Sequence, residues 1–271
     1  MLCRLVLAAF TVSAGTGSIS ATDTKPIKVL IITGDHGHQW RQTTPFIKNL
    51  LAKAGMDVDV TETPAKDLTS SNLAKYDVLF LNYKDTRNGK PETRWSEENQ
   101  KAFTQAVAEG KGLVVYHHAS SAFTNGSDFD VEFERAIAGG WRKQGNHGRR
   151  HVFTVTTRLP EDPIMQGMPA EFKHSNDELY QNSVLLSNCR VLATAFADKA
   201  IDPKNSGKHE PVVWVAQYGR GRVYENALGH DVTAMQSIGF QTLLIRGVEW
   251  AATGHVSFPV PEELSKAGNK K

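Results

Sequence analysis

The chain has 271 residues, of which 31 are Lys or Arg and 29 are Asp or Glu, so its formal net charge at pH 7 is only +2. No long basic stripe is present to follow a phosphate backbone, which argues against nucleic acid as a partner. No apolar run reaches the roughly 20 residues of a membrane-spanning helix, so no membrane span is expected.

The first residues resemble a cleavable secretory signal. They contain one cation, Arg4, an apolar stretch over residues 5–12 and an end made of small residues. We therefore expect a signal peptide over residues 1–21 and a periplasmic or secreted protein. Its removal leaves Cys189 as the only cysteine in the sequence, which excludes a disulfide framework.

The first half of the remaining chain alternates strands with helices. Ile27–Thr33 is a nearly continuous apolar run, the pattern of a strand buried on both faces of a parallel sheet. A helix follows at 3.6-residue spacing until Gly55, and a second helix begins after Ser96, whose hydroxyl can cap it. Further strands are predicted at Met56–Val60, Val78–Asn82 and Gly112–Tyr116. This alternation indicates a doubly wound α/β sheet, mostly parallel.

The second half is less regular and predicts an antiparallel excursion from that sheet. His151–Thr157 alternates like a more exposed strand, and a hairpin-type connection follows a later strand at Tyr218–Gly221. The other strands are predicted at Val191–Phe196, Val212–Gln217 and Arg222–Leu228, before a final helix that carries Phe240 and Ala251 on one face. No Pro/Ser/Gly-rich linker interrupts the chain, so we expect one domain over residues 25–256 and a flexible tail over 257–271.

Histidines follow several of these strands. In open α/β sheets the ligand crevice lies beyond the carboxyl ends of the strands, so such residues can converge. His36 and His38 follow the first strand, just before Trp40. Two imidazoles one residue apart can bind a metal or a hydroxylated ligand. They can equally belong to a polar loop in which they cap the helix or bond to one another.

The turn after Gly112–Tyr116 is the sharpest candidate. A strand-to-helix elbow exposes one side chain at the top of the sheet, beside amides that can hold negative charge. Strand alternation turns His117 toward the core and His118 toward the site, so we expect His118 to be a general acid, a general base or a metal ligand, close to Ser120. Neither Gly-x-Ser-x-Gly nor Gly-x-Cys-x-Gly occurs, which argues against an acyl-enzyme.

Two later clusters add carboxylates. Asp177, Glu178 and Tyr180 follow a predicted loop and can bind sugar hydroxyls, hold a divalent cation or orient a histidine, or they form a solvated acidic turn. Asp231 can orient its neighbour His230, or His118, and can also cap a helix.

A cationic segment around His147 and Trp141 either covers the site or is a solvated loop. Walker, Gly-x-Gly-x-x-Gly and His-Glu-x-x-His motifs do not occur in the sequence, so no nucleotide cofactor and no zincin mechanism is expected.

In this order, the motifs Val115–Ser120, Asp177–Tyr180 and Pro211–Asp231 resemble the trehalose-utilisation (ThuA-like) family, and the resemblance spans residues 27–252. It implies a flavodoxin-like fold akin to class I glutamine amidotransferases. Histidines stand where those enzymes have a nucleophilic cysteine, so glutamine hydrolysis is not implied. Metabolism of disaccharides or their 3-keto derivatives is implied, with a divalent metal such as zinc in some members.

These features predict an exported enzyme that acts on a sugar. They are also compatible with assembly of the chain into a homo-oligomer. A 3-keto group acidifies the neighbouring C–H, so a histidine base can begin elimination of the glycosidic bond. The alternatives are a sugar-binding protein without turnover and a metal-dependent amide or ester hydrolase. The predicted residues are His118, His230 and Asp231 for catalysis; His36, Trp40, Ser120, His147, Asp177, Glu178 and Tyr180 for substrate; and His36, His38, His118 and His230 for metal.

Overall fold

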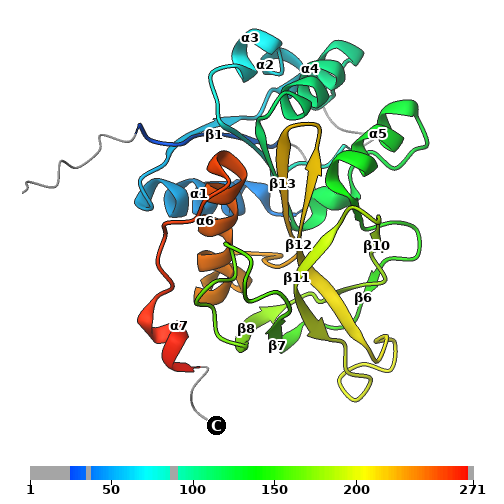
Figure 1. Ribbon diagram of the computed structural model, residues 1–271. Coiled ribbons are helices and arrows are strands. Elements are labelled where there is room, and N and C mark those ends of the chain that lie inside the picture. Colours follow the sequence, from blue (N-terminus) through cyan, green and yellow to red (C-terminus); the bar gives the residue numbers. More distant parts are fainter. Residues whose placement is uncertain (1–24, 35–37, 86–90, 268–271) are drawn as a thin grey trace, which may run out of the picture.

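The computed structural model describes residues 25–34, 38–85 and 91–267, and its centre is a nine-stranded sheet (Figure 1). One half is parallel, in the order β2 (Asp57–Thr61), β1 (Lys28–Ile32), β3 (Val78–Leu81), β4 (Gly112–Tyr116) and β13 (Gly221–Asn226). The antiparallel half continues with β12 (His209–Tyr218), β11 (Arg190–Phe196), β7 (His151–Thr157) and β8 (Glu171–Asp177). The predicted α/β class and the antiparallel excursion are confirmed.

Helices cover both faces of the parallel half (Figure 1). Val29 and Ile31 of β1 pack in one apolar cluster with α1 (Trp40–Lys53) and α6 (Ile238–Thr253), whereas Leu30 and Ile32 pack in another with α4 (Glu97–Ala108) and α5 (Asp128–Ile137). Because side chains alternate between two buried faces, these strands are continuous apolar runs. The predicted cap is present, since the Ser96 hydroxyl accepts the N–H of Asn99.

Shorter elements connect these layers. Two small sheets pair β5 (Gly139–Gly140) with β10 (Val184–Leu185) and β6 (Asn146–His147) with β9 (Tyr180–Gln181). The remaining short helices are α2 (Pro64–Asp67), α3 (Ser70–Leu73), η1 (Pro91–Thr93), η2 (His117–Ser121) and η3 (Ala234–Gln236).

Part of the expected flexible tail is helical. Within residues 257–271 the structure has α7 (Glu262–Ala267), and Leu264 of that helix is only 5% exposed. Leu264 joins the same apolar cluster as α6, which explains why a lysine-containing segment folds onto the domain. The tail is therefore packed at least as far as this helix.

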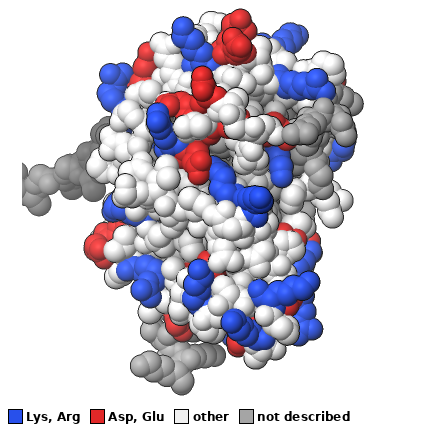
Figure 2. Space-filling view, turned by 90° about the vertical axis from the view of Figure 1, so that its right-hand side faces the viewer, with Lys and Arg blue, Asp and Glu red and all other residues white. Residues whose placement is uncertain are grey.

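No helix within the described ranges has the length and hydropathy needed to cross a bilayer. On the face shown in Figure 2, Lys and Arg side chains are interspersed with Asp and Glu. This mixture agrees with the near-neutral charge of the sequence.

The direction of the strands decides where functional side chains collect. β1, β4 and β13 run parallel, so their carboxyl ends lie at one edge of the sheet. The successive antiparallel pairings from β13 to β8 restore that direction, and β8 therefore also ends at this edge. Backbone hydrogen bonds from Gly229 and His230 to Asp177 join the end of β8 to the segment after β13.

Candidate metal centre

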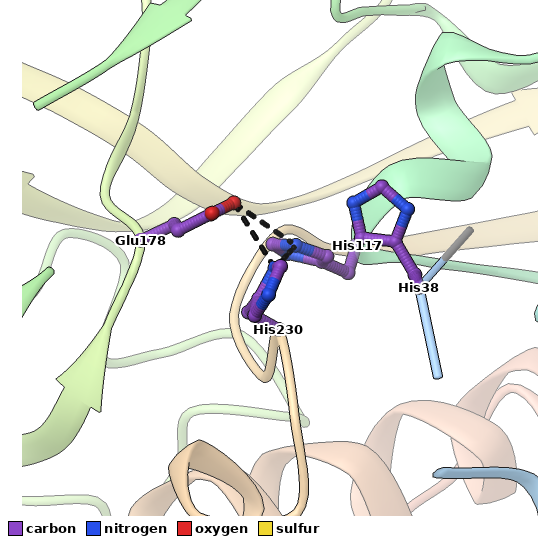
Figure 3. A group of neighbouring side chains, drawn as sticks. All are labelled: His38, His117, Glu178 and His230. Atoms are coloured by element: carbon purple, nitrogen blue, oxygen red, sulfur yellow. Dashed lines mark hydrogen bonds and ion pairs between the residues drawn. The ribbon is translucent and has the colours of Figure 1, made fainter. Parts of the chain in front are cut away.

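Four side chains converge at this edge of the sheet: His38, His117, Glu178 and His230 (Figure 3). Each contributes one ligand atom, and these four atoms all lie within 4.8 Å of one another. His38 lies between β1 and α1, His117 follows β4, Glu178 follows β8, and His230 follows β13. Among the described residues, no other group of three or more His, Cys, Asp or Glu side chains has this arrangement.

His117 sits at the elbow after β4 in an unusual backbone conformation. Its φ is 47°, in the left-handed region that non-glycine residues rarely adopt, and its ring is fully buried. Nδ1 lies 2.7 Å from the carbonyl oxygen of Ala227. A carbonyl only accepts hydrogen bonds, so we assign the proton to Nδ1, and the neutral ring then presents the lone pair of Nε2 to the site.

That Nε2 atom faces three polar groups. It lies 2.9 Å from the Tyr180 hydroxyl, 3.3 Å from Nδ1 of His230 and 3.7 Å from Oε2 of Glu178. Histidine ligands of metals commonly donate their other ring N–H to a backbone carbonyl, as His117 does here. His117 is therefore oriented to bind a metal ion or to accept a proton through Nε2.

Glu178 supplies the negative charge of the cluster. Its Oε2 lies 3.1 Å from Nδ1 of His230, and its Oε1 lies 3.6 Å from Nε2 of His147. Burial alone would raise the pKa of Glu178, but interactions with His117 and His230 outweigh it and hold the pKa below its usual range. The hydrogen bond to Glu178 in turn raises the pKa of His230, although its partial burial opposes this shift. Glu178 is therefore a carboxylate at neutral pH.

Three imidazole nitrogens and one carboxylate oxygen are a donor set that zinc and related divalent cations use. In tetrahedral coordination at about 2.1 Å, neighbouring ligand atoms are roughly 3.4 Å apart. The distances of 3.1–3.7 Å among His117, Glu178 and His230 already lie in this range. The residues present therefore fit a divalent cation.

The expectation that His118 is exposed to the site is wrong. Its side chain is 1% exposed and stacks on the His38 ring, with centroids 4.2 Å apart and an interplanar angle of 2°. Strand alternation ends at Tyr116, because the left-handed conformation of His117 starts the η2 turn one residue earlier than assumed. His117, expected to be a core residue, is the member of the pair that joins the cluster.

Three other predicted residues lie outside the cluster. Asp231 accepts the N–H of Ala234, the first residue of η3, at 3.0 Å, and it pairs with Arg150 at 2.7 Å. Ser120 is buried and donates its hydroxyl to the carbonyl of His117. Trp40 is buried at the start of α1.

His36, a predicted substrate and metal contact, lies outside the described residues.

Tyr180 and His147 lie beside the cluster and are paired in register through the β6–β9 sheet. The Tyr180 hydroxyl contacts His117, and its ring lies 4.5 Å from that of Trp141. The His147 side chain is 41% exposed, with Nδ1 bonded to the carbonyl of Gly148. Its Nε2 lies 3.6 Å from Oε1 of Glu178.

Asp177 does not reach solvent. Its side chain is fully buried and bonds to His174, a residue the sequence analysis did not single out. Both residues occupy positions of β8 where a conventional strand pattern has apolar side chains. The predicted loop before Asp177 is in fact this strand.

A family profile for ThuA, described as trehalose utilisation, matches residues 28–251. A ThuA-like protein from Parabacteroides merdae ATCC 43184 is 33% identical, with a TM-score of 0.76, and the match covers 89% of this chain and 95% of that protein. A ThuA-like protein from Bacteroides uniformis ATCC 8492 is 21% identical over 88% and 98% of the two chains, with a TM-score of 0.65.

A β-galactosidase from Rahnella sp. R3 shares the fold over 87% of this chain but only 33% of its own length, at 18% identity and a TM-score of 0.54. No curated relative matches the chain. The profile match and the 33% identical structure both extend over nearly the whole domain described above. The chain therefore belongs to the ThuA family, which connects it with carbohydrate metabolism.

Proposed function

We propose that the protein is an exported, divalent-metal-dependent enzyme that cleaves or converts a disaccharide or a 3-keto-glycoside. The observation that carries the metal part is the cluster of His38, His117, Glu178 and His230 within 4.8 Å. The sugar part is supported by membership of the ThuA family, and export by the signal-like residues 1–21.

The hydrogen bonds of the cluster suit a cation as well as its position does. In the neutral tautomer in which Nδ1 donates to Ala227, Nε2 of His117 carries the lone pair, and Glu178 is ionised. When bound, a divalent cation polarises an oxygen atom of the substrate or of water. Zinc is the proposed metal, because three imidazoles and one carboxylate match its ligand preferences.

Two residues of the chain are proposed to move protons in this reaction. The His147 side chain is 41% exposed and, in the neutral tautomer in which Nδ1 donates to Gly148, presents the lone pair of Nε2, so it is the proposed base that removes the acidic C–H of a keto-sugar. The Tyr180 hydroxyl, buried against His117, is the proposed donor to the departing sugar oxygen. In this proposal His147 replaces His118 as the base, because His118 is 1% exposed and stacked on His38 whereas the His147 side chain is 41% exposed.

The test combines metal analysis with product detection. The purified protein is incubated with trehalose and with a 3-keto-disaccharide, with and without chelator, and bound metal is measured by elemental analysis. We expect one divalent ion per chain and turnover that chelator abolishes. Glu178→Gln is expected to lose both, whereas Glu171→Gln, an exposed residue at the far end of β8, retains both.

Other outcomes point elsewhere. Bound sugar without product after long incubation would identify a sugar-binding protein, and cleavage of amides or esters alone would identify a metal-dependent hydrolase of another class. Turnover that persists without metal would contradict the proposed role of the cluster.

A further inference from the structure

Asp177 is a fully buried carboxylate that accepts four hydrogen bonds. Oδ1 accepts the backbone N–H groups of Glu178 at 2.8 Å and His230 at 3.0 Å. Oδ2 accepts the N–H of Gly229 at 2.6 Å and Nε2–H of His174 at 2.7 Å. The donors come from two segments that are about fifty residues apart in sequence.

The carboxylate therefore links the two segments that carry Glu178 and His230. A single oxygen, Oδ1, bonds to the backbone nitrogens of both residues, whose side chains meet 3.1 Å apart in the cluster. Burial would raise the pKa of Asp177, but the bonds from His174 and from the Gly229 backbone outweigh it and lower the pKa. With four donors already bound and no exposed surface, Asp177 is not available to a sugar hydroxyl.

The segment that Asp177 holds is also restrained from its other side. Gly229 has φ 94°, and a Cβ atom added there would lie 2.6 Å from the Phe240 ring. The Tyr116 hydroxyl donates to the carbonyl of Gly229. Gly229 is thus fixed through both its N–H and its carbonyl, and the position of His230 depends on these bonds.

We propose that Asp177 is a positioning residue that sets the distance between Glu178 and His230 and thereby the metal affinity of the site. The inference rests on the proposed metal-dependent function. Groups that orient metal ligands from behind typically change affinity about 10-fold to 100-fold when they are removed.

Asp177→Asn is the direct test, because asparagine keeps the shape but replaces one acceptor oxygen with an NH2 group that faces N–H donors. The matched control is Asp162→Asn. Asp162 is also buried, at 3% exposure, and accepts a backbone N–H from Ile164 at 3.0 Å, but it lies in the loop before β8 and contacts no residue of the cluster.

Affinity for Co²⁺ and Zn²⁺ is measured by calorimetric titration, the Co²⁺ absorption spectrum reports ligand geometry, and thermal unfolding reports stability. We expect Asp177→Asn to lower affinity about 10-fold to 100-fold and to alter the Co²⁺ spectrum. Asp162→Asn is expected to lower only the stability. A folded Asp177→Asn protein with wild-type affinity and spectrum would overturn the inference while leaving the proposed function intact.

If Asp177→Asn does not fold, His174→Ala decides, because it removes one of the two bonds to Oδ2 of Asp177 and leaves the bond from the Gly229 backbone in place. We expect it to weaken binding at least several-fold, with recovery in His174→Gln, whose amide can still donate. Equal affinity of wild type and His174→Ala would overturn the inference. Absence of metal binding by the wild-type protein would overturn the proposed function and this inference together.

Discussion

The side chain of His117 and the backbone of Ala227 are joined by a 2.7 Å contact from Nδ1 to the carbonyl oxygen, and this contact selects which ring nitrogen faces the cluster. It ties the turn after β4 to the end of the neighbouring strand β13. The other nitrogen is thereby presented to Tyr180, Glu178 and His230 before any ligand arrives.

His117 and His118 provide a matched pair of buried histidines, at 0% and 1% exposure. We expect His117→Ala to lower zinc affinity by more than about 100-fold, because it removes a direct ligand. His118→Ala removes a buried ring that stacks on His38 and contacts the rings of Tyr116 and His117 but is not one of the four cluster residues, so its effect on affinity should stay below about tenfold. Calorimetric titration of both variants checks this order, and the reverse order would return the ligand role to His118.

Tyr180→Phe separates proton transfer from metal binding. The hydroxyl competes with a cation for Nε2 of His117, so its removal is expected to leave zinc affinity unchanged or raised. Turnover of the sugar substrate should fall about 100-fold or more, as is typical when a general acid is lost. Affinity and kcat are measured on the same preparation. A parallel loss of both would show that Tyr180 supports the fold of the site instead of donating a proton.

Zinc should stabilise the native protein. At a free concentration of about 100 times Kd, binding to the folded state alone adds about 2.7 kcal/mol to the free energy of unfolding. For a domain of this size, that gain corresponds to a rise in Tm of about 5–10 °C. Thermal scans with and without zinc measure it, and Glu178→Gln should show a much smaller rise. An equal rise in that variant would locate the binding site elsewhere.

Glu225 gives a prediction about pH. It is fully buried in β13, and burial raises its pKa well above the usual 4.5, an effect that Ser120 and Arg142 offset only in part. Above its ordinary pKa the unfolded chain releases this proton while the native state keeps it, so the free energy of unfolding falls as pH rises. Glu225→Gln removes that loss and should be more stable than wild type near pH 8, with little difference near pH 5.

Urea unfolding at several values between about pH 5 and pH 8 checks the slope. Glu171→Gln, which changes an exposed carboxylate, should follow the wild-type curve. A Glu225→Gln curve parallel to wild type would mean that Glu225 is already ionised in the folded protein.

The sheet was largely predictable because its parallel strands are apolar on both faces. β8 was not, since His174 and Asp177 occupy two of its buried positions and Phe172 is its one buried apolar side chain. α5 was also missed, although Ser127 and Asp130 form a capping box that the sequence displays.

The sequence identified most residues of the cluster as candidates, but it selected the wrong histidine of the pair at positions 117 and 118. His38, His230 and Glu178 were recognised as candidates because they follow strands or predicted loops. The choice between His117 and His118 depended on a single backbone angle, the φ of 47° at His117, which strand alternation does not contain. The role of Asp177 depends on contacts with Gly229 and His230, and no local pattern encodes contacts over that separation.

The four cluster residues occur at positions 38, 117, 178 and 230, so the site is distributed over most of the chain. During synthesis, a ribosome-bound fragment that ends before β13 lacks both His230 and the Ala227 carbonyl that orients His117. Such a nascent chain offers dispersed imidazoles instead of an assembled chelate. Tight retention of a cation would thus distinguish finished molecules from truncated or half-folded ones.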